Sequence, residues 1–417
     1  MRITQPTHLN DYNVSLPASK SISNRVLVIN ALAENKHLPK NVSDCDDTRV
    51  MIEWLNERPE TIDIGAAGTA MRFSTALLTI MEGTHVITGS QRMLQRPIGV
   101  LVDALRQLGA DIEYLEKNGF PPLKIKGKKG LEGGEICLRG DVSSQYVSAL
   151  LMIAPYMNKG LKINLQGQVI SRPYIDLTLN IMRCFGAVAE WEGENSVKVT
   201  DKPYIPREFI VENDWSASSY WYEFVALNQG QCTITMKGLK PDSWQGDAQV
   251  AKIFRMIGVE TQFITLTDGS TAARIANSLK AVEKMEYDFV NQPDLAQTLT
   301  VTCCMKGIPF HFKGLQSLRI KETDRLTALR TELAKLGFKI EEHNGSELIW
   351  DGNRRQLTNS QLDEVAIETY DDHRMAMSFA PTALTLKSIN INNPEVVSKS
   401  YPNFWEEMKN AGFVIIK

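Results

Sequence analysis

Apolar residues recur along much of the chain at helical spacing, and alternating apolar and polar positions follow each such stretch. The first pattern predicts an amphipathic helix, and the alternation predicts a half-buried strand. A glycine separates the two in five segments, where it can adopt the left-handed conformation that ends a helix. The five segments are residues 101–114, 177–191, 250–263, 326–341 and 404–416.

The glycines of these segments lie about 70 to 80 residues apart, and a fixed period indicates a repeated structural unit. They are Gly109, Gly186, Gly258, Gly337 and Gly412. A sixth copy without a glycine is expected at residues 51–55, followed by a strand at 61–64. Coincidence is the alternative interpretation, because a helix, a glycine and a strand are a common succession in α/β proteins. Six units favour an α/β fold with two domains of three units each, and a crossing between domains near residues 211–214.

Composition changes this picture little. Of the 417 residues, 43% are hydrophobic and 23% are charged, which is typical of a globular protein. A net charge of −3 argues against general nucleic-acid binding, which needs a basic excess. No apolar run has the length of a membrane helix, and the first residues lack the apolar core of a signal peptide, so we expect a cytoplasmic protein. The six cysteines lack C-x-x-C spacing, which favours buried thiols over zinc or disulfides.

Charged residues are concentrated at residues 319–325, which read Arg-Ile-Lys-Glu-Thr-Asp-Arg. On a helix, Lys321 and Arg325 would share a face. Similar cationic groups recur at 19–25, 95–97 and 371–374 and at Lys399. Cations that converge from distant segments predict a site for phosphate or carboxylate groups. Residues 124–129 read Lys-Ile-Lys-Gly-Lys-Lys, and this alternation of lysines with other residues predicts a solvated edge strand.

Several common catalytic motifs are missing from the sequence. It contains no phosphate loop of the G-x-x-x-x-G-K-[ST] type, no G-x-G-x-x-G after a strand, no H-E-x-x-H and no G-x-S-x-G. We therefore expect a site of lysine, arginine, serine and aspartate without a metal or cofactor. Serines before apolar helical runs, such as Ser143 and Ser144, fit either helix caps or an anion pocket.

The motifs together resemble the 5-enolpyruvylshikimate-3-phosphate (EPSP) synthase family over nearly the whole chain, in order. The segments that carry the resemblance are 16–25, 67–72, 95–99, 142–145, 171–176, 293–294, 319–325 and 372–377. The resemblance implies the two-domain enolpyruvyl transferase fold, with three βαβαββ repeats in each domain and the active site in the interdomain cleft. We expect residues 20–212 to form one domain, and residues 1–19 with 213–417 to form the other.

The resemblance also implies the reaction and its residues. Phosphoenolpyruvate would give its enolpyruvyl group to the 5-hydroxyl of shikimate 3-phosphate and release phosphate, by addition and then elimination. The implied ligands of shikimate 3-phosphate are Lys20, Ser21, Arg25, Ser143, Ser144, Gln145, Ser171, Asp294 and Lys321. The implied ligands of phosphoenolpyruvate are Lys20, Gly68, Arg96, Gln145, Arg325, Arg374 and Lys399. Neither nucleic acid nor membrane is an expected partner, and a monomer is expected.

Asp294 matches the general base of the family, and Glu322 and Lys20 are candidates for protonating the methylene carbon. A helix cap is the alternative role for Asp294, because Pro293 precedes it and an apolar run follows. His373 is expected to orient its neighbours.

The sequence departs from the family pattern at Ala66, Phe73, Trp215 and Ser317. These departures bear on substrate contacts and on glyphosate, whose pocket in the family lies beside Gly68. A related transferase that acts on a UDP-sugar is a competing interpretation, but that enzyme carries a cysteine on a loop that has none here, at residues 91–99. An inactive binding paralogue is another, and the presence of Asp294, Glu322 and Lys20 counts against it.

Overall fold

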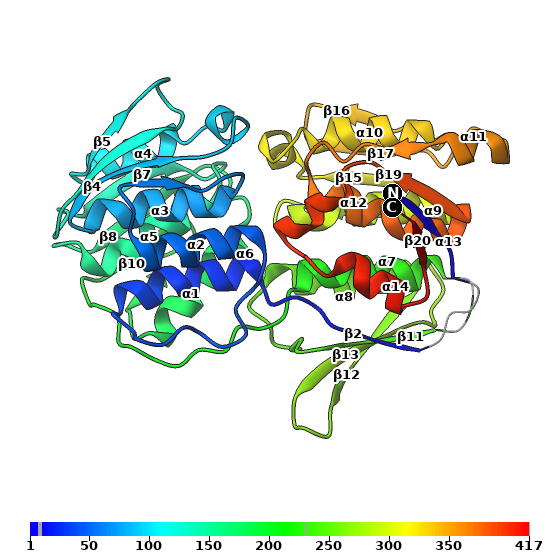
Figure 1. Ribbon diagram of the computed structural model, residues 1–417, viewed down its shortest axis with the longest axis horizontal. Coiled ribbons are helices and arrows are strands. Elements are labelled where there is room, and N and C mark those ends of the chain that lie inside the picture. Colours follow the sequence, from blue (N-terminus) through cyan, green and yellow to red (C-terminus); the bar gives the residue numbers. More distant parts are fainter. Residues whose placement is uncertain (7–10, 229, 231, 417) are drawn as a thin grey trace. The chain divides into compact units, whose positions relative to one another are not determined.

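The computed structural model describes residues 1–6, 11–228, 230 and 232–416 (Figure 1). The chain forms two compact units. Unit 1 comprises Met1–Pro17 and Glu212–Lys417, and unit 2 comprises Ala18–Val211. Unit 2 is thus an insertion near the start of unit 1, and the chain passes between the units after Pro17 and after Val211.

Five four-stranded sheets repeat one topology. Within each repeat the first two strands are parallel, and the remaining two add in antiparallel fashion in the spatial order first, second, fourth, third. A helix connects the parallel strands, as a parallel crossover requires, and a second helix leads to the third strand. The predicted α/β fold and its βαβαββ repeat are confirmed in these five copies.

Unit 2 contains two of the sheets and six α-helices. The strands are β3 (Thr61–Asp63), β4 (Gly83–Thr88), β5 (Asp111–Tyr114), β6 (Leu123–Gly127), β7 (Gly134–Arg139), β8 (Leu161–Gln166), β9 (Ala189–Trp191) and β10 (Ser196–Val199). The helices are α1 (Lys20–Leu32), α2 (Asp46–Glu57), α3 (Gly68–Ile80), α4 (Gly99–Gln107), α5 (Ser144–Ile153) and α6 (Arg172–Cys184). Two short 3-10 helices are η1 (Met93–Gln95) and η2 (Ala154–Tyr156).

Unit 1 contains the other three sheets. Its strands are β1 (Arg2–Thr4), β2 (Tyr12–Val14), β11 (Thr233–Lys237), β12 (Val259–Thr265), β13 (Thr271–Asn277), β14 (Met285–Asp288), β15 (Phe310–Lys313), β16 (Glu341–His343), β17 (Glu347–Trp350), β18 (Ala366–Ile367), β19 (Ser388–Ile391) and β20 (Val414–Ile416). Its α-helices are α7 (Trp215–Leu227), α8 (Val250–Met256), α9 (Ala296–Lys306), α10 (Arg325–Lys335), α11 (Asn359–Glu364), α12 (His373–Phe379), α13 (Ala383–Leu386) and α14 (Phe404–Asn410). Its 3-10 helices are η3 (Gly246–Gln249), η4 (Pro293–Leu295), η5 (Gln316–Ile320), η6 (Ala380–Thr382) and η7 (Pro394–Lys399).

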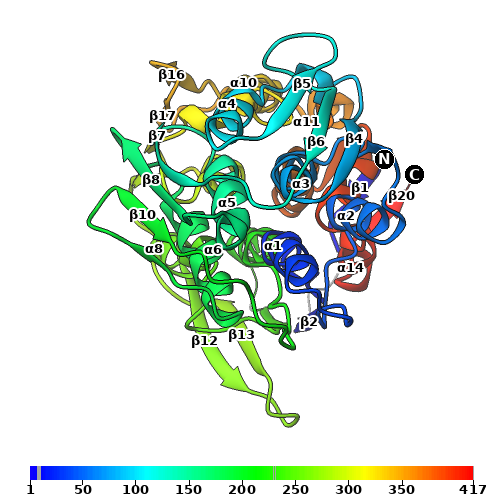
Figure 2. The ribbon, with the colours of Figure 1, turned by 90° about the vertical axis from the view of Figure 1, so that its left-hand side faces the viewer.

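Three helices form the centre of each unit. In unit 2, α3 packs against α1 and α5, and every residue of α3 is buried. Figure 2 looks onto this unit and shows the three helices side by side. In unit 1, α7, α9 and α12 pack together in the same way. Four of these central helices follow the first strand of a repeat: α3, α5, α9 and α12. The other two, α1 and α7, follow the places where the chain passes from one unit to the other.

The predicted glycines end the second helix of each repeat. All five have φ between 84° and 108°, which a residue with a side chain rarely adopts. Each is followed by the third strand of its sheet, as the alternating pattern predicts. The glycine therefore reverses the chain between the outer helix and the sheet.

Two expectations are corrected by the strand pairing. The strand expected at 61–64 forms as β3, but it pairs in parallel with β4 as the first strand of the next repeat, so the sixth copy is wrong there. Elsewhere in unit 2, an isolated parallel bridge joins Lys40 and Ile210 outside the named strands. The lysine-rich strand β6 lies between β4 and β5 and is not an edge strand. Its lysines instead face carboxylates of β5, such as Asp111, whose Oδ2 lies 3.5 Å from Lys126 Nζ.

The central helices of unit 1 bury one carboxyl group, that of Glu223 on α7. Its side chain is fully buried and has no ion-pair partner within the described residues. Burial raises the pKa of Glu223 well above its usual range, and Thr302 offsets this only in part. The folded protein thus holds a proton that an unfolded chain releases above about pH 4.3.

We predict that Glu223→Gln stabilises the protein at pH 8 but not at pH 4. The contribution of Glu223 to the stability of the native protein should fall as pH rises above the unfolded pKa, because only the folded state retains this proton. The measurement is the thermal midpoint of both proteins at each pH, with Glu364→Gln on the exposed helix α11 as the control. Equal effects of Glu223→Gln at pH 4 and pH 8 would contradict this explanation.

Candidate active site

The predicted site residues follow parallel strands at one edge of each sheet. The first two strands of a repeat are parallel, so their carboxyl ends lie at the same edge, where α/β proteins commonly bind ligands. In unit 2, these strand ends and the start of α1 provide the unit 2 cluster: Lys20, Ser21, Arg25, Gly68, Arg96, Ser143, Ser144, Gln145 and Ser171. In unit 1, they provide the unit 1 cluster: Asp294, Lys321, Glu322, Arg325, Arg374 and Lys399.

The amino-terminal ends of α1, α3 and α5 are linked by polar contacts. Gln145 Nε2 donates to Thr69 Oγ1 at 3.2 Å, and the backbone N–H of Thr69 donates to Asp47 Oδ1 at 3.4 Å. Asp47 also lies 3.9 Å from Lys20 Nζ. The three helix ends therefore meet at one place, and helix amino-termini favour anions there.

The serines of the unit 2 cluster occupy helix starts. Ser143 caps α5 by accepting a hydrogen bond from Gln145 N at 3.4 Å, so the cap interpretation is confirmed for this serine. Ser144 is the first residue of α5 and is buried. Ser171 precedes α6 with φ of 54°, an unfavourable conformation for a serine. Ile170 N donates to Gly140 O at 3.1 Å, which joins the loops before α5 and α6.

Arg25 is buried beneath this cluster. Its guanidinium donates to Thr178 Oγ1, Ser148 Oγ and the carbonyls of Ser21 and Tyr174, at 2.7 to 3.3 Å. These are neutral groups, and no carboxylate pairs with Arg25 in the described part of the chain. Burial lowers the pKa of Arg25 to about 10, because the charge lacks a counter-ion. An anion bound above it would supply one.

Phe73 is one of the positions at which the sequence departs from the family pattern, and the structure shows a contact of its ring with Arg25. The Arg25 guanidinium carbon lies 5.3 Å from the centre of the Phe73 ring, a cation–π contact. Phe73 is fully buried on α3. The aromatic ring therefore stabilises the buried arginine from its α3 side.

Arg96 lies against the start of α3. A Cβ atom added to Gly68 would come within 2.6 Å of Arg96 Nη1, so the guanidinium needs the space that glycine leaves. Tyr146 Oη donates to Pro97 O at 2.6 Å and fixes the loop that carries Arg96. Arg96 Nε is buried without a hydrogen-bond partner among the described residues. A buried N–H of this kind gains free energy from an acceptor on a ligand.

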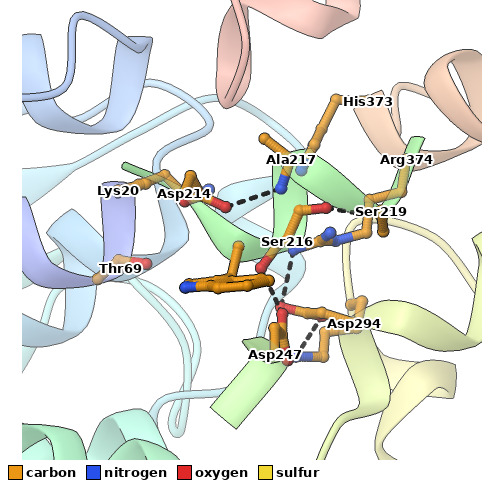
Figure 3. Close-up of polar contacts among 12 residues, drawn as sticks. Lys20, Thr69, Asp214, Ser216, Ala217, Ser219, Asp247, Asp294, His373 and Arg374 are labelled. Carbon is orange, nitrogen blue, oxygen red and sulfur yellow. Dashed lines mark hydrogen bonds and ion pairs between the residues drawn. The ribbon is translucent and has the colours of Figure 1, made fainter. Parts of the chain in front are cut away.

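Asp294 lies at the centre of the unit 1 cluster. Its Oδ1 is 3.0 Å from Arg325 Nη1 and 3.7 Å from Lys321 Nζ, and its Oδ2 is 2.9 Å from Arg374 Nη2 (Figure 3 shows Asp294 and Arg374). Asp294 lies inside η4, whose N-cap residue is Gln292, and the N-cap residue of the following helix α9 is Leu295. Asp294 is therefore not the cap residue of either helix, and its carboxylate points to three cations.

The cations set the ionisation of Asp294. Burial disfavours the charged carboxylate, but Arg374, Lys321 and Arg325 outweigh it and hold the pKa of Asp294 well below its usual range. Burial conversely lowers the pKa of Lys321, and Asp294 partly offsets this. The carboxylate is therefore ionised at neutral pH, but it is a weak base while all three cations face it.

The helix expected across residues 319–325 begins only at Arg325. Asp324 caps α10 by accepting from the N–H groups of Leu326 and Thr327, and Lys321 lies before the helix in an extended conformation. The expectation that Lys321 and Arg325 share a helix face is therefore wrong. The two cations nevertheless meet, because both approach Asp294.

Arg325 is bound by three carboxylates. Its Nε and Nη2 donate to Asp372 at 2.6 and 3.3 Å, Nη1 donates to Asp294, and Nη2 donates to Glu322 at 2.9 Å. Asp372 also caps α12 through Arg374 N at 2.9 Å. Lys399 Nζ donates to the carbonyl of Asp371 at 2.6 Å, next to this segment. Ion pairs within unit 1 thus connect five residues of the cluster, and the sixth, Lys399, binds the adjoining segment at Asp371.

The repeat identifies further residues that the motifs did not reveal. The third sheet of unit 1 places Asp247 after β11, the position that Lys321 and Lys399 hold after β15 and β19. Asp247 accepts a hydrogen bond from Ser216 Oγ (Figure 3). Burial and Asp294 raise the pKa of Asp247 to about 7, although Arg374 opposes this. Comparing the strand ends of all repeats would have found Asp247.

Trp215, another family departure, supports the start of α7. Its indole packs on Phe263 of β12 at 6.1 Å between ring centres, and its Nε1 donates to Glu212 Oε1 at 3.0 Å. Glu212 also accepts from Lys240 N and Ser243 Oγ, at 3.0 and 2.7 Å. The bulky ring therefore joins the chain crossing to the β12–β13 hairpin. Ala66 is exposed and Ser317 lies on η5, and nothing in the structure explains these two departures.

Within the described residues, no group of three or more histidine, cysteine, aspartate or glutamate side chains could hold a metal ion. A search of the same residues for helices of membrane-spanning length and hydropathy finds none.

The βαβαββ repeats define a class of two-unit α/β proteins, and in unit 1 three cations surround a partly buried carboxylate. Comparison with known proteins identifies the family. The family model described as EPSP synthase (3-phosphoshikimate 1-carboxyvinyltransferase) matches residues 3–58 and 54–408. The chain belongs to the EPSP synthase family.

Relatives and solved structures agree with this assignment. A 3-phosphoshikimate 1-carboxyvinyltransferase of Bacteroides fragilis is 52% identical over 402 residues, covering 96% of this chain and 95% of the relative. An enzyme of the same name from Vibrio campbellii is 37% identical and covers 97% of this chain and 98% of the relative. A structure of EPSP synthase from Acinetobacter baumannii has the same fold, with a TM-score of 0.78 at 20% identity, covering 100% of this chain and 99% of that one.

Proposed function

We propose that the unit 1 and unit 2 clusters bind the same two substrates and that Asp294 is the base of the reaction. As a member of the EPSP synthase family, the protein transfers the enolpyruvyl group of phosphoenolpyruvate to the 5-hydroxyl of shikimate 3-phosphate and releases phosphate. It thereby serves the shikimate pathway of aromatic amino-acid synthesis and is a glyphosate target. The observation that carries the residue assignment is the partly buried Asp294 carboxylate among three cations.

Shikimate 3-phosphate is proposed to bind mainly to the unit 2 cluster. Arg25 supplies a buried charge without a counter-ion, and the helix starts at Ser21, Ser144 and Ser171 supply hydroxyl groups. Lys20, Ser143 and Gln145 complete this set, with Asp294 and Lys321 reaching the same substrate from unit 1. The amino-terminal ends of α1, α3 and α5 meet, and helix amino-termini favour phosphate, which supports this proposal.

Phosphoenolpyruvate is proposed to bind the arginines that can form two-pronged contacts. Arg96 offers a buried unpaired N–H beside Gly68, and Arg374 and Arg325 flank Asp294. Lys20, Gln145 and Lys399 complete the proposed set. Planar guanidinium groups match phosphate and carboxylate geometry, which supports their assignment to a substrate that carries both.

The chemistry follows from these positions. In the addition step, Asp294 takes the proton of the 5-hydroxyl group of shikimate 3-phosphate. The hydroxyl oxygen then bonds to C2 of phosphoenolpyruvate, and Lys20 or Glu322 protonates the methylene carbon. In the elimination step, the resulting methyl carbon returns a proton to the same group, Lys20 or Glu322, while the C2–O bond to phosphate breaks. The enolpyruvyl double bond forms and inorganic phosphate leaves. Substrate anions that pair with Arg374, Arg325 and Lys321 reduce the positive electrostatic potential at Asp294. Its pKa then rises, so substrate binding itself makes the carboxylate a stronger base.

We further propose that the two units are the two domains of the enzyme and that it acts as a cytoplasmic monomer. We propose that it uses no cofactor, metal, nucleic acid or membrane. The net charge of −3 supports the absence of a nucleic-acid partner.

We predict that Asp294→Ala lowers kcat at least about 100-fold, because general base catalysis typically contributes this much. Binding of shikimate 3-phosphate should persist or tighten, because the variant leaves three cations without their carboxylate. Phosphate release measures the rate, and calorimetry measures binding. Near-normal turnover by Asp294→Ala would remove this residue from the mechanism.

We also predict that Arg96→Lys raises the KM for phosphoenolpyruvate roughly tenfold or more, which corresponds to about 1.4 kcal/mol. The lysine retains the charge and loses the two-pronged geometry. The KM for shikimate 3-phosphate should change little. Steady-state kinetics with each substrate varied separately provides the measurement.

Two further variants test whether the effect of Arg96→Lys comes from the position of its guanidinium group. Gly68→Ala should displace the guanidinium end of Arg96 and produce the same selective loss with an unchanged thermal midpoint, because that end is flexible. Arg92→Lys on the exposed part of the same loop should have no effect. Equal losses for both substrates, or no loss, would refute the assignment of Arg96.

A further inference from the structure

A strained turn precedes Arg374 of the unit 1 cluster. Tyr370 and Asp371 have φ values of 52° and 54°, so two successive residues with side chains adopt the left-handed conformation. This conformation is unfavourable for such residues and persists only where surrounding contacts enforce it. The turn leads directly into Asp372 and Arg374.

A buried carboxylate anchors one side of the turn. Tyr370 Oη donates to Glu332 Oε1 at 2.6 Å. The other oxygen, Oε2, accepts from Glu368 N at 3.0 Å and from Lys335 Nζ at 2.6 Å. Glu332 is fully buried, whereas Tyr370 is 39% exposed, so the carboxylate holds the exposed turn from the protein interior.

Two bonds anchor the other side. The Asp371 carbonyl accepts from Lys399 Nζ at 2.6 Å, and Asp371 Oδ1 accepts from Asn393 Nδ2 at 2.7 Å. Lys399 ends η7, and Asn393 precedes it. The turn is therefore bonded to the segment that carries another residue of the unit 1 cluster.

Helix α10 fixes both ends of the segment that contains the turn. Its first residue, Arg325, binds the Asp372 carboxylate, and Glu332 lies seven residues later, which is two helical turns on the same face. Glu332 holds the segment before the turn while Arg325 holds it after the turn. The position of Arg374, whose Nη2 lies 2.9 Å from Asp294, depends on this two-point attachment.

We propose that Glu332 and Tyr370 are positioning residues for phosphoenolpyruvate: their hydrogen bond holds the strained turn that aligns Arg374 and Lys399. The inference rests on the proposed function, because it takes these two cations as ligands of that substrate. Neither Glu332 nor Tyr370 needs to touch the substrate. The effect of losing their bond should therefore be selective for phosphoenolpyruvate and should leave shikimate 3-phosphate binding unchanged.

The decisive variant is Tyr370→Phe, which removes only the hydroxyl. We expect the KM for phosphoenolpyruvate to rise roughly threefold to tenfold, the effect of one hydrogen bond. The KM for shikimate 3-phosphate should stay within twofold, about the resolution of such kinetics. Tyr222→Phe is the matched control, because Tyr222 is in the same unit and its hydroxyl bonds only Thr261 among the described residues, at 2.8 Å.

Two more variants separate the inference from the function on which it rests. Arg374→Lys tests the proposed subsite directly and should raise the same KM at least tenfold. Glu332→Gln retains a hydrogen-bond partner for the Tyr370 hydroxyl, because the amide nitrogen can donate to it while the amide oxygen accepts from Glu368 N and Lys335 Nζ. It should therefore have a smaller effect than Tyr370→Phe. If Arg374→Lys is selective but Tyr370→Phe behaves like Tyr222→Phe, the positioning role is wrong and the subsite stands. If Arg374→Lys shows no selectivity, the subsite itself is wrong.

Discussion

The attraction of one partly buried carboxylate to three cations is the interaction on which the unit 1 cluster depends. Without Asp294, the charges of Arg325, Arg374 and Lys321 would repel one another with less compensation, although Arg325 would keep Glu322 and Asp372. With it, the cluster is balanced and preorganised for substrate anions, which electrostatic stabilisation of a transition state requires. Under the proposed assignment of the substrates, the same balance keeps Asp294 a weak base until substrate anions share its cations. The proposal thereby couples binding to catalysis through charge.

The repeat explains how residues far apart in sequence reach these clusters. Each βαβαββ unit brings two parallel strands to one edge of its sheet and starts a buried helix there. Unit 2 uses these positions for neutral hydroxyl groups and two arginines without carboxylate partners, Arg25 and Arg96. Unit 1 uses them for Asp294, which pairs with cations, and for Asp247, which accepts a hydrogen bond from Ser216. One unit therefore offers uncompensated positive charge, whereas the other holds the groups that can move protons.

Much of this arrangement could be predicted from the sequence, because the helix, glycine and strand pattern is local. The five glycines and the βαβαββ units appear as expected. The start of α10 was missed because Asp324 competes for the backbone as a cap, which places Lys321 outside the helix. The interior position of β6 was missed because its lysines pair with carboxylates of the neighbouring strand. Asp247, Glu332 and the turn at Tyr370 carry no local motif, and only tertiary contacts reveal them.

The claim that substrate anions control Asp294 can be measured at the carboxylate itself. Protein labelled with ¹³C at aspartate side chains, and assigned with the Asp294→Asn variant, reports the titration of this group by NMR. The free protein should keep Asp294 ionised down to the lowest pH at which it remains folded. With shikimate 3-phosphate and inorganic phosphate bound, the carboxyl group should titrate at a higher pH, because the anions draw on its three cations. An unchanged titration in the ligand-bound protein would contradict the account.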